Sequence, residues 1–359
     1  MTDQKTDHTS NKIIDSAVSQ SLAARLVALT FGTGILIYLQ SILIPVVLAI
    51  LLAFLLSPLI HKLTQIGIPY GLSIVSSQII TLVVVLGALM LFSVSVGPLS
   101  RALPKYRNAL IKEITEIVEW GSGKITNPKT RESLKVEIGE SILPKAIDQG
   151  VKMTQRGLST TTSILGYFFL TLLLSTFMLL EASHMKNKLR EAYDDEHPLL
   201  ISMKDIGEDV RAYVVAKTLI SLLTSFCVWL VLAIAQVDFA VFWALLAFPL
   251  NFIPTVGAIV ASLPPVIIAL IDPDLSGTSI LIVVIGLLLV NGFIGSVIDP
   301  RYVGQKVKLS PLVVLISMLV WGIIWGPVGM ILAVPIMVSL KVIFSHIEGL
   351  QPIAILMRG

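Results

Sequence analysis

The fold is limited above all by two long, uncharged apolar stretches near the end of the chain, Phe239 to Ile271 and Ser310 to Leu340. A straight helix of about 32 residues would be roughly 48 Å long, whereas the hydrocarbon core of a bilayer is about 30 Å thick. Each stretch is therefore too long for one simple crossing. Proline and glycine lie near the middle of each, at Asn251 to Gly257 and Gly322 to Gly329, where they permit a reversal. We predict two broken helices or re-entrant helical hairpins.

The rest of the chain has the composition of a polytopic membrane protein. Hydrophobic residues make up 55% of it, too many for an ordinary soluble domain. The polar start, Met1 to Ser21, has no apolar run followed by a small-residue cleavage site, so we expect no removable signal peptide. We therefore predict an all-α polytopic membrane protein, in contact with the lipid bilayer and anchored by its first span.

Hydropathy predicts six full spans beside the two hairpins. They are Leu22 to Tyr38, Ile42 to Ile60, Leu72 to Val96, Leu158 to Leu180, Tyr213 to Ala235 and Ile280 to Ile298. Polar segments divide the chain further. We expect a tail at 1–21, a scaffold of three spans at 22–98, a small helical insert at 99–157, a fourth span at 158–181, a helical linker at 182–212, a transport region at 213–344 and a second tail at 345–359.

The distribution of Lys and Arg in short loops predicts the orientation. Both termini are expected in the cytoplasm and the 99–157 insert outside. If Phe239 to Ile271 enters and leaves on the outer side, Asp272 and Asp274 lie outside and the basic loop after Asp299 lies inside. A single crossing would instead place that basic loop outside. The charge rule therefore favours a hairpin that opens outward, followed by a second that opens toward the cytoplasm.

The two hairpins also resemble each other in sequence. Pro254-Thr255-Val256-Gly257 leads through an apolar run to Pro264, and Pro327-Val328-Gly329 leads through another to Pro335. A span followed by a hairpin, repeated with opposite topology, is the inverted-repeat plan of many secondary transporters. The alternative is that Pro-Val-Gly recurs by chance in a chain rich in Val and Gly.

The sequence offers no sign of a cofactor, a metal site or an enzyme active site. Cys227 is the single cysteine, no Cys or His cluster has metal-ligand spacing, and nucleophile-elbow, zinc-protease and phosphate-loop motifs are absent. The 26 basic and 23 acidic residues are interleaved and form no basic patch with aromatics. We expect no cofactor, no metal, no catalytic residue and no nucleic-acid partner.

Several ordered motifs resemble the autoinducer-2 exporter family of bacterial permeases. They are Gly295 to Gly304 (GSVIDPRYVG), Leu309 to Val314 (LSPLVV), Trp321-Gly322, Gly326 to Met330 (GPVGM), Val334-Pro335, and Asn251 to Pro254 (NFIP) leading to Pro264-Pro265. Weaker similarity covers Leu103 to Asn108, Phe177 to Glu181 and Lys217-Thr218. Where the family commonly has Asn-x-x-Glu-Pro, this chain has Ser296 to Pro300, which keeps an acid but shortens it. The resemblance implies a homo-oligomeric transporter. Some members export a small polyhydroxylated signal, and others are implicated in sodium or lithium exchange for protons.

The helix breaks are the candidate substrate-binding positions. Half-helix ends leave free backbone N–H and C=O groups that a solute could satisfy, whereas the plainer interpretation is that these residues only form tight turns. Asn291, inside a span, either contacts the substrate or holds two helices together. The candidate binding residues are Asn251, Pro254, Gly257, Asn291, Gly326, Pro327 and Gly329.

Four charged residues are candidates for coupling or gating. Asp299 and Arg301 flank Pro300, and Asp299 either carries a coupling proton or cation or pairs with Arg301 to anchor a helix end. Glu181 and Lys217 lie at span ends, where snorkelling to the interface competes with a functional ion pair. Three other acids, Asp238, Asp272 and Asp274, fall in outer loops and are expected to be solvated.

These patterns favour a bacterial inner-membrane secondary transporter. It would export a small polar signal or metabolite, with autoinducer-2 as the candidate solute, by alternating exposure of a site between the hairpins, with proton or sodium coupling. The first spans and the insert would form the homo-oligomer. Two alternatives remain: a sodium or lithium/proton antiporter, and a non-transporting membrane scaffold.

Overall fold

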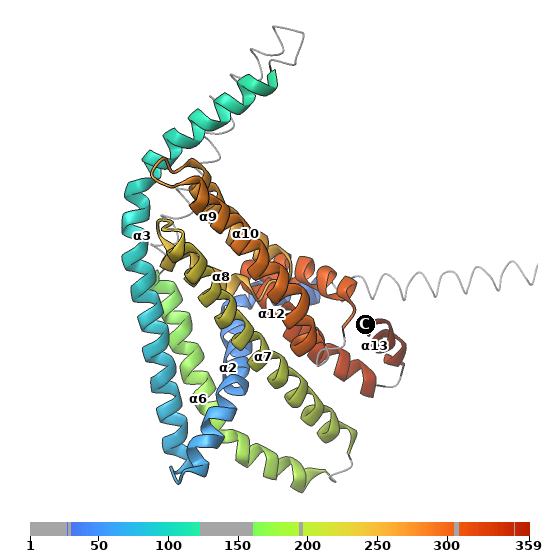
Figure 1. The fold of residues 1–359 in the computed structure, drawn as a ribbon. Helices are drawn as coiled ribbons and strands as arrows, with labels where there is room; N and C mark the ends of the chain where they lie inside the picture. The colour runs from blue at the N-terminus through green and yellow to red at the C-terminus, as the bar shows by residue number, and fades with distance from the viewer. Residues whose placement is uncertain (1–26, 28–29, 123–160, 194–196, 305–308, 348) are drawn as a thin grey trace, which may run out of the picture.

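The computed structural model describes residues 27, 30–122, 161–193, 197–304, 309–347 and 349–359 (Figure 1). The predicted tail at 1–21 and most of the predicted insert lie outside the described residues. The helices are α2 (Gln40–Gln65), α3 (Tyr70–Ser122), α6 (Thr161–Ala192), α7 (Pro198–Ile234), α8 (Ala240–Leu250), α9 (Val256–Ile271), α10 (Gly277–Phe293), α12 (Pro311–His346) and α13 (Gln351–Leu356), with π-helical segments η2 (Ile294–Ile298) and η3 (Pro300–Gly304).

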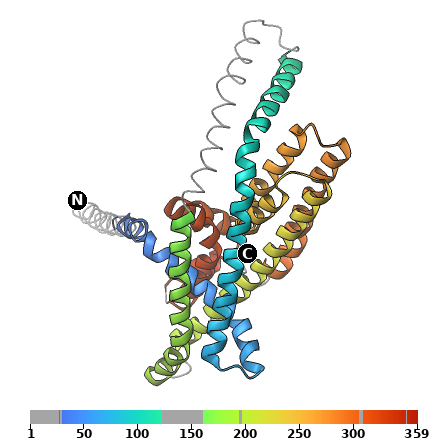
Figure 2. The same ribbon diagram turned by 90° about the vertical axis from the view of Figure 1, so that its left-hand side faces the viewer.

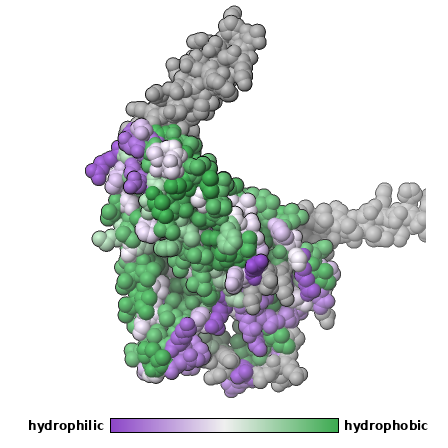
Figure 3. All heavy atoms as spheres, viewed as in Figure 1, coloured by the Kyte–Doolittle hydropathy of each residue, from purple (hydrophilic) through white to green (hydrophobic). Residues whose placement is uncertain are grey.

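Six helical stretches are long and apolar enough to cross a membrane. They are Gln40–Gln65, Tyr70–Leu99, Leu165–Ala182, Leu200–Ile234, Gly277–Tyr302 and Pro311–His346, the last of which is interrupted at Gly326. In one view of the surface, apolar side chains cover the middle and hydrophilic ones gather toward the two ends (Figure 3). The prediction of an all-α polytopic membrane protein is confirmed.

The polar segments continue the membrane helices. The start of the predicted insert, 99–122, extends α3 without interruption, so that α3 projects beyond the bundle (Figures 1 and 2). The linker at 182–212 is divided between the end of α6 and the start of α7. Of the first predicted span, residues 30–38 are helical, and the carbonyl oxygen of Leu36 accepts a hydrogen bond from Trp325 Nε1 at 3.0 Å.

The first predicted break is a tight reversal between α8 and α9, which together we call hairpin 1. The turn includes Thr255, whose backbone has a positive φ of 63°. A Cβ atom on Gly257 would lie 1.7 Å from the carbonyl oxygen of Leu250, so only glycine allows the two arms to approach this closely. Glycine and proline therefore end α8 and begin α9 where the sequence predicts.

The second break lies inside α12, which we call hairpin 2. Gly326 has φ 63° and ψ −147°, a conformation essentially restricted to glycine. A Cβ atom on Gly329 would lie 1.9 Å from the carbonyl oxygen of Trp321, although residues eight apart in a straight helix are about 12 Å apart. Met318 and Ala333 also share one buried cluster. The chain therefore reverses at Gly326 into two antiparallel arms.

The two ends of hairpin 1 come together, and the start of hairpin 2 meets the C-terminal segment of the chain. Asp238 precedes α8 and Asp272 follows α9, yet both carboxylates lie within hydrogen-bond distance of the Tyr106 hydroxyl. Hairpin 1 thus opens at the end of the bundle where α3 leaves it. At the start of hairpin 2, the backbone N–H of Ser310 donates to the carbonyl oxygen of Met357 at 2.9 Å, and α13 packs against α12.

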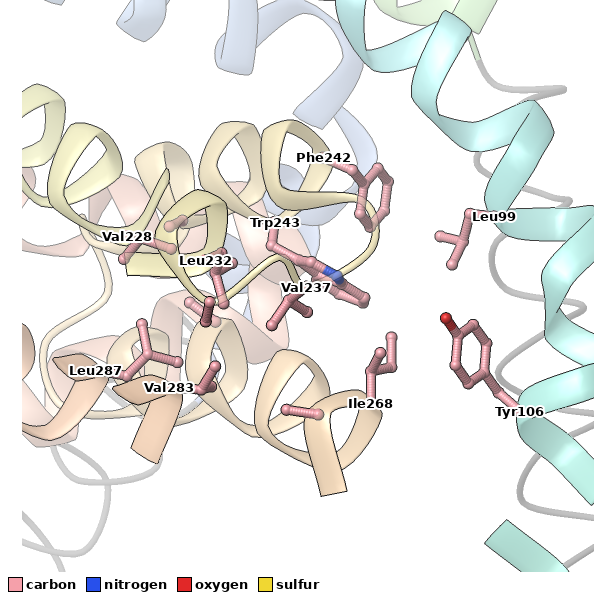
Figure 4. Close-up of a cluster of buried hydrophobic side chains, with 14 of the residues drawn as sticks. Leu99, Tyr106, Val228, Leu232, Val237, Phe242, Trp243, Ile268, Val283 and Leu287 are labelled. Carbon is pink, nitrogen blue, oxygen red and sulfur yellow. The ribbon is translucent and has the colours of Figure 1, made fainter. Parts of the chain in front are cut away.

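The helices form two groups joined by α7. In one group, α2 packs against both α3 and α6. The other contains α7, α8, α9 and α10, and a buried apolar cluster around Trp243 holds it together and reaches α3 through Leu99 and Tyr106 (Figure 4). Hairpin 2 contacts α7 and, around Trp325, the start of α2. This arrangement places both hairpins beside α7.

Candidate transport site

A buried ion pair joins α7 to the π-helical segment after α10. Lys217 Nζ lies 2.6 Å from Asp299 Oδ2, and the Lys217 side chain is 3% exposed. Asp299 stands between η2 and η3, directly before Pro300. Proline has no N–H to continue a helical ladder, and π-helical turns are frequent at functional sites, so Asp299 stands where the regular helix is interrupted.

Asp299 does not pair with Arg301, which was one of the two expectations for it. Its carboxylate binds Lys217, and Arg301 is exposed. Residues two apart on a helix do not face each other, which explains why Arg301 does not reach Asp299. Lys217 does not snorkel to an interface but is buried. Glu181 pairs with Lys188 at 3.0 Å on the exposed end of α6.

The ion pair lines a cavity of about 390 Å³, which we call the inner cavity. Its wall includes Pro254 and Thr255 from the tip of hairpin 1. Both arms of hairpin 2 contribute as well, through Val314, Met318 and Val334. The cavity is therefore the place where α7, the π-helical segment and both hairpins meet.

Two polar atoms in the inner cavity have no hydrogen-bond partner among the described residues. They are Asp299 Oδ1 and the hydroxyl oxygen of Tyr213, both buried. A buried polar group without a partner costs about 1–3 kcal/mol, so such atoms mark a place that a solute or ion would satisfy. The arrangement offers one acceptor, one donor and a neutralised pair of charges.

The other predicted site residues have structural contacts. Asn251 donates to Ser221 Oγ at 3.0 Å and fixes the tip of hairpin 1 to α7. Asn291 donates to Ser262 Oγ at 2.8 Å, which ties α10 to α9. Gly257 lies at the close approach within hairpin 1. Gly326, Pro327 and Gly329 form the tip of hairpin 2, next to Trp325 and Val328, which pack against α2 rather than around the inner cavity.

Tyr213 is a site residue that the sequence analysis missed. It appears there only as the start of a span. The signal lies in its spacing: Tyr213, Lys217, Ser221 and Thr224 recur at intervals of four, four and three and are all buried. That spacing places them on one face of a helix. A polar stripe within an apolar span is unusual enough to indicate a functional face.

The loop acids at the open end of hairpin 1 form a second cluster, and one expectation about them is wrong. Asp272 was expected to be solvated but is buried, because the Tyr106 hydroxyl and Lys105 cover it. Tyr106 lies 2.6 Å from Asp238 Oδ2, and Lys105 Nζ lies 2.9 Å from Asp274 Oδ2. Burial, and then the hydrogen bond to Asp238, raise the pKa of Tyr106 well above its ordinary value. We call this cluster the outer clamp.

The fold and the site together define the class of protein. A multi-pass helical bundle with two broken hairpins around a buried ion pair has the architecture of a membrane protein with a polar interior. Within a membrane, non-helical backbone is tolerated only where protein buries it or where it lines a wet cavity. The turn of hairpin 1 meets this condition, because Pro254 and Thr255 line the inner cavity.

The chain belongs to the AI-2E transporter family, whose family model matches residues 26–349. It is 30% identical to the AI-2 transport protein TqsA of Escherichia coli K12 over 324 residues, covering 89% of this chain and 90% of the relative. A putative transport protein of Haemophilus influenzae is 30% identical, covering 84% and 85% of the two chains. The putative transport protein YhhT of Escherichia coli K12 is 28% identical, with 88% of each chain covered.

Proposed function

We propose that the protein is a secondary transporter that moves a small polar solute across the bacterial inner membrane by alternating access. The observation that carries the proposal is the convergence of both hairpin structures on the Lys217–Asp299 pair and its cavity. A solute held there would lie between elements that open toward opposite ends of the bundle. Autoinducer-2 is the first candidate solute, because a relative that this chain resembles along most of its length is named for its transport.

In this mechanism the ion pair acts as the coupling element. When Asp299 gains a proton or a cation, its attraction to Lys217 weakens, and the π-helical segment is freed from α7. Because the same pair borders both hairpins, its breaking would change which end of the inner cavity is sealed. Export of the solute in exchange for an entering proton or sodium ion would follow.

A cation/proton antiporter is the second candidate. It is favoured by Asp299 Oδ1, a buried carboxylate oxygen with no partner among the described residues. Such an oxygen could bind a sodium or lithium ion in place of Lys217. The net neutrality of the resting pair makes this second to a neutral or polar solute.

The proposal also includes orientation and assembly. Both termini lie in the cytoplasm, with the two hairpins re-entering from opposite sides of the membrane. The most apolar stretch of α3 has no buried residue among those described, so we propose that α3 contributes to a homo-oligomeric contact. Cysteine cross-linking of Val83→Cys in a Cys227→Ala background would test this. Absence of any intersubunit product would overturn the assembly.

Flux into proteoliposomes tests the function. Purified protein is given autoinducer-2 under an imposed proton gradient and then under an imposed sodium gradient. Asp299→Asn is the test variant. Asp205→Asn is the matched control, because Asp205 is an exposed residue of α7. We expect gradient-driven solute flux that Asp299→Asn reduces at least tenfold and Asp205→Asn leaves unchanged.

Two results would change the conclusion. Cation-driven pH change without organic flux, lost in Asp299→Asn, would place the antiporter first. Full solute flux in Asp299→Asn would overturn the assignment of the ion pair as the coupling element.

A further inference from the structure

A second cavity lies on the other side of α7. It has a volume of about 700 Å³ and is enclosed by α2, α6 and α7 together with the tips of both hairpins. Gln40 and Ser41 at the start of α2 line it, as do Phe252 of hairpin 1 and Val328 of hairpin 2. We call it the outer cavity, because it extends toward the start of α2, whereas the inner cavity extends toward Leu309 and Pro311 at the base of hairpin 2.

Tyr213 is the one residue that lines both cavities, among the lining residues that the structure describes. On α7 its neighbours separate to the two sides. Lys217, one turn later, faces the inner cavity, and Val214 and Thr218 face the outer cavity. Tyr213 as a whole is 2% exposed, and its hydroxyl has no partner among the described residues. The ring therefore stands as a partition, with a free hydrogen-bonding group at the boundary.

The charges that line the two cavities limit which solutes could occupy them. The described lining of the outer cavity is mostly apolar, with a few hydroxyl and amide groups, among them Ser41, Thr171 and Thr218, and no charged side chain. The inner cavity contains one Lys and one Asp that compensate each other. A charged solute crossing such a route would lose its hydration without gaining an unpaired opposite charge, and burying a charge costs far more than burying a neutral hydroxyl group.

We propose that the two cavities are the two halves of one translocation route, that Tyr213 is the barrier between them, and that its hydroxyl and Asp299 Oδ1 bind a neutral, hydroxyl-bearing solute. The phenol donates to an oxygen of the solute, and Asp299 Oδ1 accepts from a solute hydroxyl. The claim that a solute crosses rests on the proposed transport function. The claim that Tyr213 separates two compartments does not.

Sidedness of cysteine labelling tests the barrier without any substrate. In a Cys227→Ala background, Val314→Cys reports on the inner cavity and Thr218→Cys on the outer cavity. A membrane-impermeant methanethiosulfonate reagent is applied on ice, without gradients, to right-side-out and inside-out vesicles. We expect each cysteine to react at least tenfold faster from one side, and the two cysteines from opposite sides.

Substitution of Tyr213 should remove that sidedness. Tyr213→Ala opens the partition, so both cysteines should react from both sides, whereas Tyr213→Phe keeps the ring and the sidedness. Tyr70→Ala is the control, because the Tyr70 hydroxyl binds the Leu179 carbonyl oxygen at 3.0 Å and Tyr70 lines neither cavity. Labelling of both cysteines from the same side, or unchanged sidedness in Tyr213→Ala that elutes as a monodisperse protein, would overturn the barrier.

Protection from labelling tests the class of solute. A small neutral polyol, the corresponding carboxylic acid and the corresponding amine are compared for slowing of Val314→Cys labelling. We expect protection by the neutral polyol alone, with about a tenfold higher concentration needed in Tyr213→Phe because one hydrogen bond is lost. Equal protection by a charged compound, or none by the polyol, would overturn the solute class. Sidedness with no flux in proteoliposomes would leave the barrier standing and contradict the proposed function.

Discussion

Lys217 and Asp299 are 82 positions apart in the chain, yet their side chains share one partly buried hydrogen bond. The sequence identified each as a charged residue at the end of an apolar span, where such residues are expensive and often functional. It did not predict the pair, because helical periodicity fixes only neighbours within one helix. Tyr213 was missed for a related reason. It is a candidate because it lines a cavity, and the cavity exists only once the helices are packed together.

At this scale we predict that breaking the ion pair is worse than removing it. Lys217→Met leaves the partly buried Asp299 without its cation, and we expect a loss of up to about 3–5 kcal/mol in the free energy of unfolding. The double variant Lys217→Met/Asp299→Leu should recover much of that loss, because neither charge remains. Thermal unfolding in detergent measures both.

A surface pair supplies the control for this measurement. Lys188→Met removes the exposed partner of Glu181, and such a pair contributes less than about 1 kcal/mol. Two results would show that Lys217 and Asp299 do not act as a coupled pair. One is a loss in Lys217→Met as small as that in Lys188→Met. The other is a loss in the double variant equal to the sum of the losses in Lys217→Met and in Asp299→Leu.

At the scale of the helix, proline and glycine made both hairpins predictable. The breaks occur at Asn251 to Gly257 and at Gly326, inside the segments that the sequence indicated. The helix ends near the polar segments were less predictable. The predicted insert begins as a continuation of α3, and the predicted linker begins in the end of α6 and finishes in the start of α7. A polar sequence rich in good helix formers gives no local signal of where the membrane ends.

We predict that the hairpin glycines are irreplaceable for two different reasons. Gly257→Ala and Gly329→Ala place a methyl group against a backbone carbonyl oxygen, which cannot rotate away, so each should lose more than about 3 kcal/mol. Gly326→Ala has open space but a backbone conformation restricted to glycine, and should lose about 1–3 kcal/mol.

Gly292→Ala is the matched substitution, because Gly292 lies in α10 with open space around its Cα. It should leave the melting temperature unchanged or raise it slightly, since alanine favours a helix by roughly 0.5–1 kcal/mol over glycine. Melting temperatures of Gly257→Ala or Gly329→Ala close to that of Gly292→Ala would mean that the hairpin arms do not approach as described.

At the scale of the whole molecule, the outer clamp connects two parts that the sequence treated separately. Tyr106 belongs to the predicted insert, whereas Asp238 and Asp272 belong to the predicted transport region. The charge rule places both segments on the same side of the membrane, but no periodicity relates their residues, so their contact could not be predicted from one sequence. The expectation that these acids are solvated failed for Asp272 for that reason.

The clamp predicts a loss of stability at alkaline pH. The pKa of Tyr106 is raised in the folded protein, first by burial and then by Asp238, while in the unfolded chain it returns to about 10. Below pH 10 the phenol is neutral in both states and the stabilisation is complete. Above pH 10 the unfolded chain releases the proton first, so the free energy of unfolding falls as the pH rises.

Melting temperatures of the parent protein and of Tyr106→Phe between pH 8 and pH 11 test this prediction. At pH 8 the variant should lose about 1.5–3 kcal/mol, because hydrogen bonds to charged groups disappear. Between pH 10 and pH 11 it should decline less steeply than the parent protein. Parallel curves over that interval would show that the Tyr106 proton does not contribute.

The extension of α3 beyond Leu99 is attached to hairpin 1 near its start, through Lys105 and Tyr106 of the outer clamp. From Leu99 to Ser122 it measures about 35 Å, so a tilt of about 10° at the clamp would swing its far end by roughly 6 Å. Hairpin 1 cannot shift relative to the bundle without either dragging this arm or detaching from it. In the proposed alternating-access mechanism, a partner bound to this arm outside the bundle would therefore restrain the movement of hairpin 1.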